Sequence, residues 1–107
     1  MRVLVADDDP FSVAVMEALI VKAGHECSLA CNGTEAWELL RAPDGPRIVF
    51  LDWMMSELDG IELCRRIREQ TRGEYTYVVM LSSRNKQRDI TLAFQSGADD
   101  FITKPYL

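Results

Sequence analysis

Short apolar runs that alternate with helical patterns constrain the fold of this chain more than any other feature. The runs are continuously apolar, which is typical of parallel strands that helices cover on both faces. Chains that alternate strand and helix with right-handed crossovers form doubly wound α/β sheets. We therefore expect an α/β domain built on a parallel five-stranded sheet. The predicted strands cover residues 3–6, 27–30, 48–51, 77–81 and 101–103.

The stretches between these runs carry the signals at which helices begin and end. Asp9, Asn32 and Asp59 each offer an N-cap oxygen before a helical pattern. Gly24 and Gly97 are natural C-terminal stops. Helical spacing predicts which side chains face the core. These are Phe11, Val15, Ala18 and Leu19 in the first helix, Ile61, Cys64 and Ile67 in the third, and Ile90, Ala93 and Phe94 in the fourth.

Length and charge narrow the class of protein. A chain of 107 residues buries roughly 65% of its unfolded surface, which suffices for a single core. The net charge of -5 argues against direct nucleic-acid binding, because that needs a basic face. The sequence has no apolar run of about 18 residues, as a membrane span requires. Three cysteines without a secretion signal favour reduced thiols and a cytoplasmic location.

Charged and hydroxyl side chains stand where four of the predicted strands end. In open α/β sheets, ligands bind at the carboxyl ends of the strands, so these side chains are expected to share one crevice. They are Asp7 and Asp8 after the first strand, Asp52 after the third, Ser82 after the fourth and Lys104 after the fifth. Ser82 is preferred to Ser83 because neighbouring side chains of a strand point to opposite faces.

The acidic members of this set predict a cation site. Carboxylates that converge in a crevice repel one another, so such a cluster persists most readily around a cation. Hard oxygen ligands favour Mg²⁺ or Mn²⁺. A phosphoryl group fits beside the cation, because the Ser82 hydroxyl donates to its oxygens and Lys104 neutralises its charge. A carboxylate beside a metal and a lysine is a candidate nucleophile that forms an acyl phosphate. The alternative, a structural set of buried ion pairs, is costly.

The order and spacing of these residues resemble the receiver domains of bacterial two-component response regulators, with particular similarity to the single-domain chemotaxis regulator. Asp52 lies 44 residues after Asp8, Ser82 lies 30 after Asp52, and Lys104 lies 22 after Ser82. The resemblance covers almost the whole chain and implies a flavodoxin-like sheet of strand order 2-1-3-4-5. The matching motifs are Asp7-Asp8-Asp9, Leu51-Asp52, Leu58-Asp59-Gly60, Ser82, Gly97-Ala98-Asp99 and Lys104-Pro105.

The resemblance implies a phosphoacceptor and a metal site. Asp52 would take a phosphoryl group from a phosphohistidine of a sensor histidine kinase or a phosphotransfer protein. Asp7 and Asp8 would hold Mg²⁺ together with Asp52, and the backbone carbonyl of Met54 would be a further ligand. The domain itself would catalyse only its own phosphorylation and dephosphorylation.

The resemblance also implies a conformational switch. Ser82 would hydrogen-bond the phosphoryl group, and Lys104 would form an ion pair with it. Phe101 would turn inward when Ser82 moves, and the switched domain would control an output domain or a target protein. The Lys104–Pro105 peptide bond would be cis.

The sequence departs from the family pattern at several positions. Ser82 stands where Thr is common, Phe101 where Tyr is common, and Ser56 where Pro is usual. Met54 and Arg84 occupy variable positions that flank the phosphorylation site in receivers. They should influence how readily water attacks the acyl phosphate.

The fifth helix of the family should follow Leu107, the last residue of this sequence. Without that helix, one flank of the sheet would expose apolar residues of the first and fifth strands. We therefore expect residues 1–107 to be a C-terminally incomplete receiver domain, the N-terminal part of a longer regulator. The alternative is a homodimer in which a second copy covers this flank.

Several residues near the motifs have a simpler structural interpretation. Asp9 and Asp59 are expected to act as helix caps. Trp53 can simply pack on the surface, and Asp99 and Asp100 are expected in a surface loop without chemistry. A basic stretch at the end of the third helix is expected to be a solvated face, and it consists of Arg65, Arg66, Arg68 and Arg72.

Three other functions fit parts of the pattern. A phosphohydrolase of the haloacid-dehalogenase type combines an Asp nucleophile with Ser and Lys, but needs a second Asp where this chain has Met54. A flavin-binding domain needs a hydroxyl-rich phosphate loop, whereas residues 7–9 are acidic and would repel phosphate. A receiver-like scaffold that takes no phosphate is disfavoured by the intact Asp52, Ser82 and Lys104.

Overall fold

Strands and helices alternate along residues 1–70 and 74–104, which the computed structural model describes. The strands are β1 (Arg2–Ala6), β2 (Glu26–Ala30), β3 (Ile48–Asp52), β4 (Tyr77–Ser82) and β5 (Asp100–Thr103). The helices are α1 (Pro10–Lys22), α2 (Gly33–Leu40), α3 (Gly60–Glu69) and α4 (Gln87–Gln95). None of the helices in this described part of the chain is long and apolar enough to cross a membrane.

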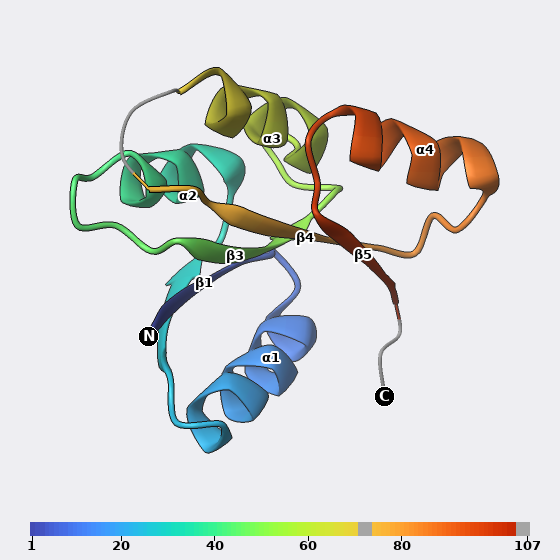
Figure 1. Ribbon diagram of the computed structural model, residues 1–107. Coiled ribbons are helices and arrows are strands. Elements are labelled where there is room, and N and C mark those ends of the chain that lie inside the picture. The colour runs from blue at the N-terminus through green and yellow to red at the C-terminus, as the bar shows by residue number, and fades with distance from the viewer. Residues whose placement is uncertain (71–73, 105–107) are drawn as a thin grey trace.

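The five strands form one parallel sheet of order β2-β1-β3-β4-β5. This confirms the predicted doubly wound, flavodoxin-like α/β fold. Figure 1 shows α2, α3 and α4 on one face of the sheet and α1 on the other. Because β1 pairs with β2 on one side and β3 on the other, the strand order reverses between β1 and β3. A crevice for ligands is expected at such a reversal, outside the carboxyl ends of the strands.

Two apolar clusters lie on opposite faces of the sheet. Leu4 and Ala6 of β1 belong to the larger cluster, which α2, α3 and α4 cover. Val3 and Val5 belong to the smaller cluster, which α1 covers. Successive side chains of a strand point to opposite faces, so a strand between two clusters must be continuously apolar. The larger cluster also contains the α3 residues predicted to face the core, which are Ile61, Cys64 and Ile67.

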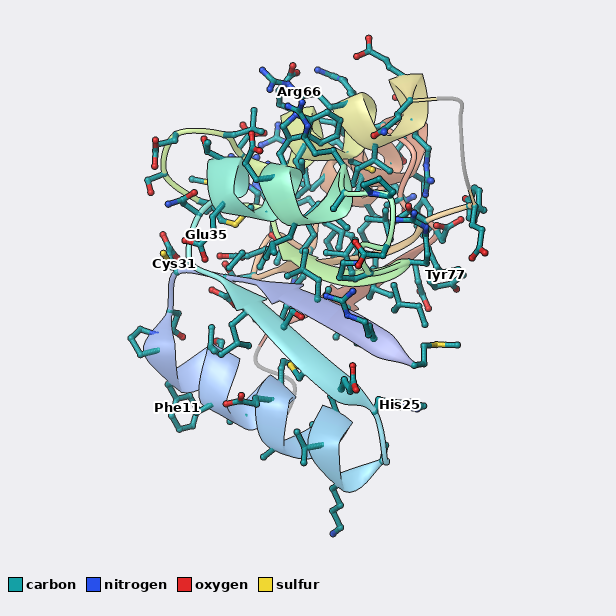
Figure 2. The ribbon with its side chains drawn as sticks, turned by 90° about the vertical axis from the view of Figure 1, so that its left-hand side faces the viewer. Phe11, His25, Cys31, Glu35, Arg66 and Tyr77 are labelled. Atoms are coloured by element: carbon teal, nitrogen blue, oxygen red, sulfur yellow. The ribbon has the colours of Figure 1, made fainter. Side chains whose placement is uncertain are left out.

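The buried face of α1 differs from the predicted one. Ser12, Met16 and Ile20 are buried against the sheet, whereas Phe11 is 63% exposed and Leu19 is 55% exposed. The Phe11 ring projects from α1 away from the sheet (Figure 2). The prediction was wrong because α1 carries apolar residues around most of its circumference, so periodicity does not select one face.

Burial also differs from the prediction in α4 and at the flank of the sheet. Ala93 of α4 is buried as predicted, but Phe94 is 45% exposed. Phe101 and Ile102 of the edge strand β5 are half-buried. The expected exposure of β1 is wrong, because its apolar residues from Val3 onward are at most 4% exposed. β1 lies between two neighbouring strands and beneath α1, which together exclude water from it.

The predicted helix caps are confirmed. The Asp9 carboxylate accepts from the Ser12 hydroxyl at 2.7 Å and from its N–H at 3.3 Å, and the bond from the Ser12 side chain lowers the pKa of Asp9. Asn32 and Asp59 each accept from the backbone N–H three residues later, at 2.8 Å and 2.9 Å. These bonds satisfy N–H groups that a helix start otherwise leaves without partners.

A polar clasp joins α3 to the amino ends of β4 and β5. The Arg68 guanidinium donates to the Thr76 carbonyl at 2.7 Å, the Gly97 carbonyl at 2.8 Å and the Asp99 carboxylate at 2.7 Å. Asp99 also accepts from the Val78 N–H at 2.8 Å. The clasp therefore connects three separate segments of the chain through one cation and one carboxylate.

The clasp corrects two expectations. Asp99 is not a surface residue without a role, since its carboxylate holds both Arg68 and the start of β4. Asp100 is exposed, but it is the first residue of β5 rather than part of a loop. In the basic stretch, Arg65 and Arg66 are exposed as expected, Arg68 is partly buried, and Arg72 lies outside the described residues.

Candidate functional site

The parallel register brings the predicted site residues to one edge of the sheet. Asp7 directly follows β1 and lies level with Asp52, the last residue of β3. Ser82 ends the neighbouring strand β4. The Lys104 N–H donates to the Ser82 carbonyl at 2.8 Å, so Lys104 enters the same edge from β5. Four strand ends thus supply the site, as the sequence predicts.

Three carboxylates converge at this edge. One oxygen from each of Asp7, Asp8 and Asp52 lies within 4.8 Å of the other two. Asp7 is 1% exposed and Asp52 is 7% exposed, whereas Asp8 is exposed. Three hard oxygen donors, two of them buried, fit a small divalent cation such as Mg²⁺, which also retains several waters. Asp9 is not part of this group, because its carboxylate caps α1.

Lys104 joins two of these carboxylates. Its ammonium nitrogen lies 2.8 Å from Asp7 Oδ2 and 3.4 Å from Asp52 Oδ1. Its side chain is 18% exposed and that of Asp7 is fully buried, so solvent screens this pair little. The ammonium is a compact positive charge next to the candidate nucleophile, where it can meet an incoming anion.

The environment of Asp52 opposes its ionisation. Burial of the carboxyl and the negative charge of Asp7 raise the pKa of Asp52 to about 7, although Lys104 acts in the opposite direction. A divalent cation among the three carboxylates would favour the ionised form and lower this pKa again. Metal binding at this site would therefore be coupled to deprotonation of Asp52.

The Ser82 hydroxyl is placed to act as a hydrogen-bond donor. Ser82 is 2% exposed, and its Oγ accepts a bond from the Arg84 N–H at 3.0 Å. A hydroxyl that accepts one bond still has its own hydrogen to donate. Ser83 is exposed, which agrees with the preference for Ser82 at this edge.

The two remaining predicted site residues lie beside this group. Phe101 is half-buried, packs against the larger apolar cluster and pairs with Met80, two residues before Ser82. The Met54 side chain is 62% exposed, so a site role for Met54 depends on its backbone carbonyl. The predicted cis bond between Lys104 and Pro105 involves a residue outside the described part of the chain.

Sequence reasoning missed the packing of Trp53. Trp53 is 4% exposed and belongs to the larger cluster, which contradicts the expectation that it packs on the surface. The Arg84 guanidinium carbon lies 5.0 Å from the centroid of its ring, and Arg84 also approaches Asp89 at 3.9 Å. The loop after β4 thus lies against the residue that follows Asp52.

A second unpredicted contact joins α2 to the loop after β3. A Cβ atom at Gly33 would lie 1.9 Å from the carbonyl oxygen of Leu58. The only signal in the sequence is a glycine at the first position of a helix, where other residues are more favourable.

Comparison with known proteins identifies the family. A family model described as the response regulator receiver domain matches residues 3–107. The chain belongs to this family, whose members are signalling modules of two-component systems.

Two curated relatives illustrate the range of this family. The chain is 36% identical over 102 residues to the transcriptional regulatory protein AfsQ1 of Streptomyces coelicolor, covering 95% of this chain and 43% of that protein. It is 28% identical over 107 residues to the chemotaxis protein CheY homolog of Campylobacter jejuni, covering 99% of this chain and 82% of that protein. The chain therefore spans less than half of the first relative and most of the second.

Solved structures share the fold closely. The receiver domain of the Francisella response regulator 1452 has a TM-score of 0.89 and 33% identity, covering 99% of this chain and 85% of that one. The receiver domain of the Pseudomonas aeruginosa sensor histidine kinase PA1611, with a magnesium ion coordinated in its active site cleft, has a TM-score of 0.84 and 26% identity, covering 99% and 86%. The Saccharomyces cerevisiae Ssk1 receiver domain, crystallised with the histidine phosphotransfer protein Ypd1, has a TM-score of 0.87 and 28% identity, covering 98% and 79%.

Proposed function

We propose that Asp52 accepts a phosphoryl group from a phosphohistidine, with Mg²⁺ bound beside it, and that the domain then changes conformation to control an output domain or a target protein. The observation that carries this proposal is the position of Lys104, 2.8 Å from Asp7 and 3.4 Å from Asp52. A partly buried carboxylate cluster with an ammonium at its side has the charges that a phosphoryl group and a dication need together.

The cation would be held by Asp7, Asp8 and Asp52, with the Met54 backbone carbonyl as a further ligand. Mg²⁺ suits these hard oxygen donors, and Mn²⁺ accepts the same ligands. When bound, the dication offsets negative charge on the phosphoryl oxygens and on the carboxylates. The magnesium ion in the related PA1611 receiver domain supports this choice.

The transfer would proceed by attack of one Asp52 carboxylate oxygen on the phosphorus atom. The new oxygen–phosphorus bond forms as the phosphorus–nitrogen bond to the donor imidazole breaks, and the imidazole leaves with its electron pair and takes up a proton. Lys104 offsets charge on the phosphoryl oxygens, and the Ser82 hydroxyl donates to one of them. Such a reaction needs positioning and charge compensation and little else from the protein.

The conformational response would begin at Ser82. To donate to a phosphoryl oxygen its hydroxyl must shift relative to the Arg84 N–H, to which it is bonded at 3.0 Å. Movement of the loop after β4 would then open space toward which Phe101 turns. Phosphorylation would thereby favour one of two conformations that the domain already populates.

The partners follow from the same chemistry. The phosphodonor would be a sensor histidine kinase or a histidine phosphotransfer protein. With either donor, this domain would act in the cytoplasm. The complex of the related Ssk1 receiver domain with Ypd1 supports a donor of this kind. The net negative charge of the chain disfavours contact with DNA phosphates. Any DNA binding would therefore belong to a separate output domain.

The proposal is tested by intact-mass measurement after incubation with Mg²⁺ and acetyl phosphate. We expect one phosphoryl increment in the parent and none in Asp52→Asn. Asp59→Asn is the matched control, because it alters an exposed capping carboxylate and leaves the cluster intact, so it should be labelled like the parent. Labelling of Asp52→Asn, or an unlabelled parent, contradicts the proposal. Turnover of a chromogenic phosphate ester would instead support a phosphohydrolase.

A further inference from the structure

The contact between α2 and the loop after β3 leaves no room for a side chain at Gly33. Gly33 is the first residue of α2 and is buried. A Cβ atom there would lie 1.9 Å from the Leu58 carbonyl oxygen and 2.7 Å from the Leu58 Cβ. The φ angle of Gly33 is not positive, so its backbone conformation suits any residue. Glycine is required at this position for space alone.

Leu58 belongs to the segment that links Asp52 to α3. The two ends of this segment are joined by the bond from the Gly60 N–H to the Trp53 carbonyl at 2.9 Å. Leu58 itself is 8% exposed and packs in the larger cluster. Its backbone rests on Gly33, so α2 sets how closely this loop approaches the sheet. The same loop carries Met54.

The end of β2, which a short turn joins to α2, contacts the other acidic loop of the site. The Asp7 N–H donates to the Ala30 carbonyl at 3.1 Å, three residues before Gly33. Asn32 fixes the start of α2 by accepting from the Glu35 N–H at 2.8 Å. Figure 2 shows this turn between the labelled residues Cys31 and Glu35. Residues 30–33 therefore contact both loops that supply the proposed metal ligands.

We infer that Gly33 is a positioning residue of the phosphorylation site, which sets the separation of the Asp7–Asp8 loop from the loop after Asp52. This inference rests on the proposed function. Mg²⁺ requires near-ideal octahedral geometry with ligands about 2.0–2.1 Å away. Addition of one methyl group at Gly33 would push the Leu58 carbonyl back by about 1 Å. A shift of this size, carried along the loop to Met54 four residues earlier, would remove its carbonyl from the metal.

The experiment compares Mg²⁺ affinity in Gly33→Ala and Gly45→Ala, each made in the full chain. Gly45 is the matched control, because a Cβ atom there would lie 2.4 Å from the Leu39 carbonyl oxygen, at the far end of α2. Mg²⁺ is titrated alone and followed by the fluorescence of Trp53, with Trp37→Phe as the common background. We expect both variants to melt at a lower temperature than the parent.

The two variants should differ in metal binding. The Mg²⁺ dissociation constant should rise at least about tenfold in Gly33→Ala, as for loss of a group that orients metal ligands. It should change less than about twofold in Gly45→Ala, because distant sites act independently. Equal affinity in Gly33→Ala and the parent, or an equal loss in Gly45→Ala, overturns the positioning role. A parent that binds no Mg²⁺ overturns the proposed function and this inference with it.

A second variant tests the same contact if Gly33→Ala does not fold. Leu58→Ala loosens the loop from its own side, without adding an atom at Gly33. Leu40→Ala is its control, because Leu40 is a buried leucine at the far end of the same helix. Mg²⁺ affinity should fall in Leu58→Ala and stay unchanged in Leu40→Ala, and any other pattern rejects the inference.

Discussion

Asp52 is a carboxyl group that the metal-free fold prefers to keep protonated. Burial and the charge of Asp7 raise its pKa to about 7, and the ammonium of Lys104 only partly opposes them. The fold therefore opposes ionisation of the carboxyl group that we propose as the nucleophile. A bound dication removes this conflict, because it favours the charged form.

The raised pKa of Asp52 predicts how stability depends on pH without metal. Between about pH 4 and pH 7 the folded state binds more protons than the unfolded state, so the free energy of unfolding falls as pH rises through this window. Asp52→Asn removes this pH-dependent fall in the free energy of unfolding, because asparagine does not ionise. The variant should match the parent at pH 4 and exceed it at pH 8 by on the order of 4 kcal/mol. Urea unfolding with a chelator present at both pH values measures the difference.

Saturating Mg²⁺ should narrow the stability difference between the two proteins at pH 8. At a concentration 100 times the dissociation constant the parent gains about 2.7 kcal/mol, and the variant gains less because a ligand is lost.

A stability gain in Asp52→Asn that is the same at pH 4 and pH 8 would show that the ionisation of Asp52 is not the cause.

At the scale of single elements, the strands were predictable and the orientation of α1 was not. A strand between two apolar clusters must be apolar at successive positions, and this pattern is visible in the sequence. α1 carries Phe11, Val15 and Leu19 along one stripe and Met16 and Ile20 along another. The second stripe packs against the sheet. Which of the two stripes packs against the sheet depends on the shape of that sheet face, and no local sequence pattern encodes this shape.

Adjacent residues of α1 provide a direct test of this orientation. Ile20→Ala should lower the free energy of unfolding by about 3 kcal/mol, because it leaves a cavity in the smaller cluster. Leu19→Ala should change it by less than about 0.5 kcal/mol, because Leu19 is 55% exposed. Chemical denaturation of the two variants beside the parent measures both values. Equal losses would place α1 in a different rotation about its axis.

At the scale of the whole molecule, the sequence predicted the edge where the site lies but not the contacts that hold it together. Asp7, Asp52, Ser82 and Lys104 could be placed because the ends of parallel strands share one edge. The contact of Gly33 with Leu58 joins residues far apart in the chain. A contact of this kind depends on how whole elements pack, so it leaves no periodic signal in the sequence.

The clasp around Arg68 is a second long-range contact with a measurable energy. Arg68→Met removes three hydrogen bonds and leaves the Asp99 carboxylate without its cation, so the free energy of unfolding should fall by about 2 kcal/mol. Arg66→Met is the matched control, since Arg66 forms an exposed ion pair with Glu62 at 3.7 Å. It should cost less than about 0.5 kcal/mol. Similar losses in both variants would indicate a general effect of charge on the stability of α3.

The ion pair between Asp7 and Lys104 joins residues 97 positions apart. A ribosome adds about 5–20 residues per second, so roughly 5–20 seconds separate the synthesis of these two residues. During that interval the nascent chain carries the acidic residues of the site without their ammonium partner. A chain that terminates early lacks Lys104 altogether. Only a polypeptide translated past β5 can place this ammonium beside the carboxylates, so the proposed phosphorylation requires completed synthesis of the sheet.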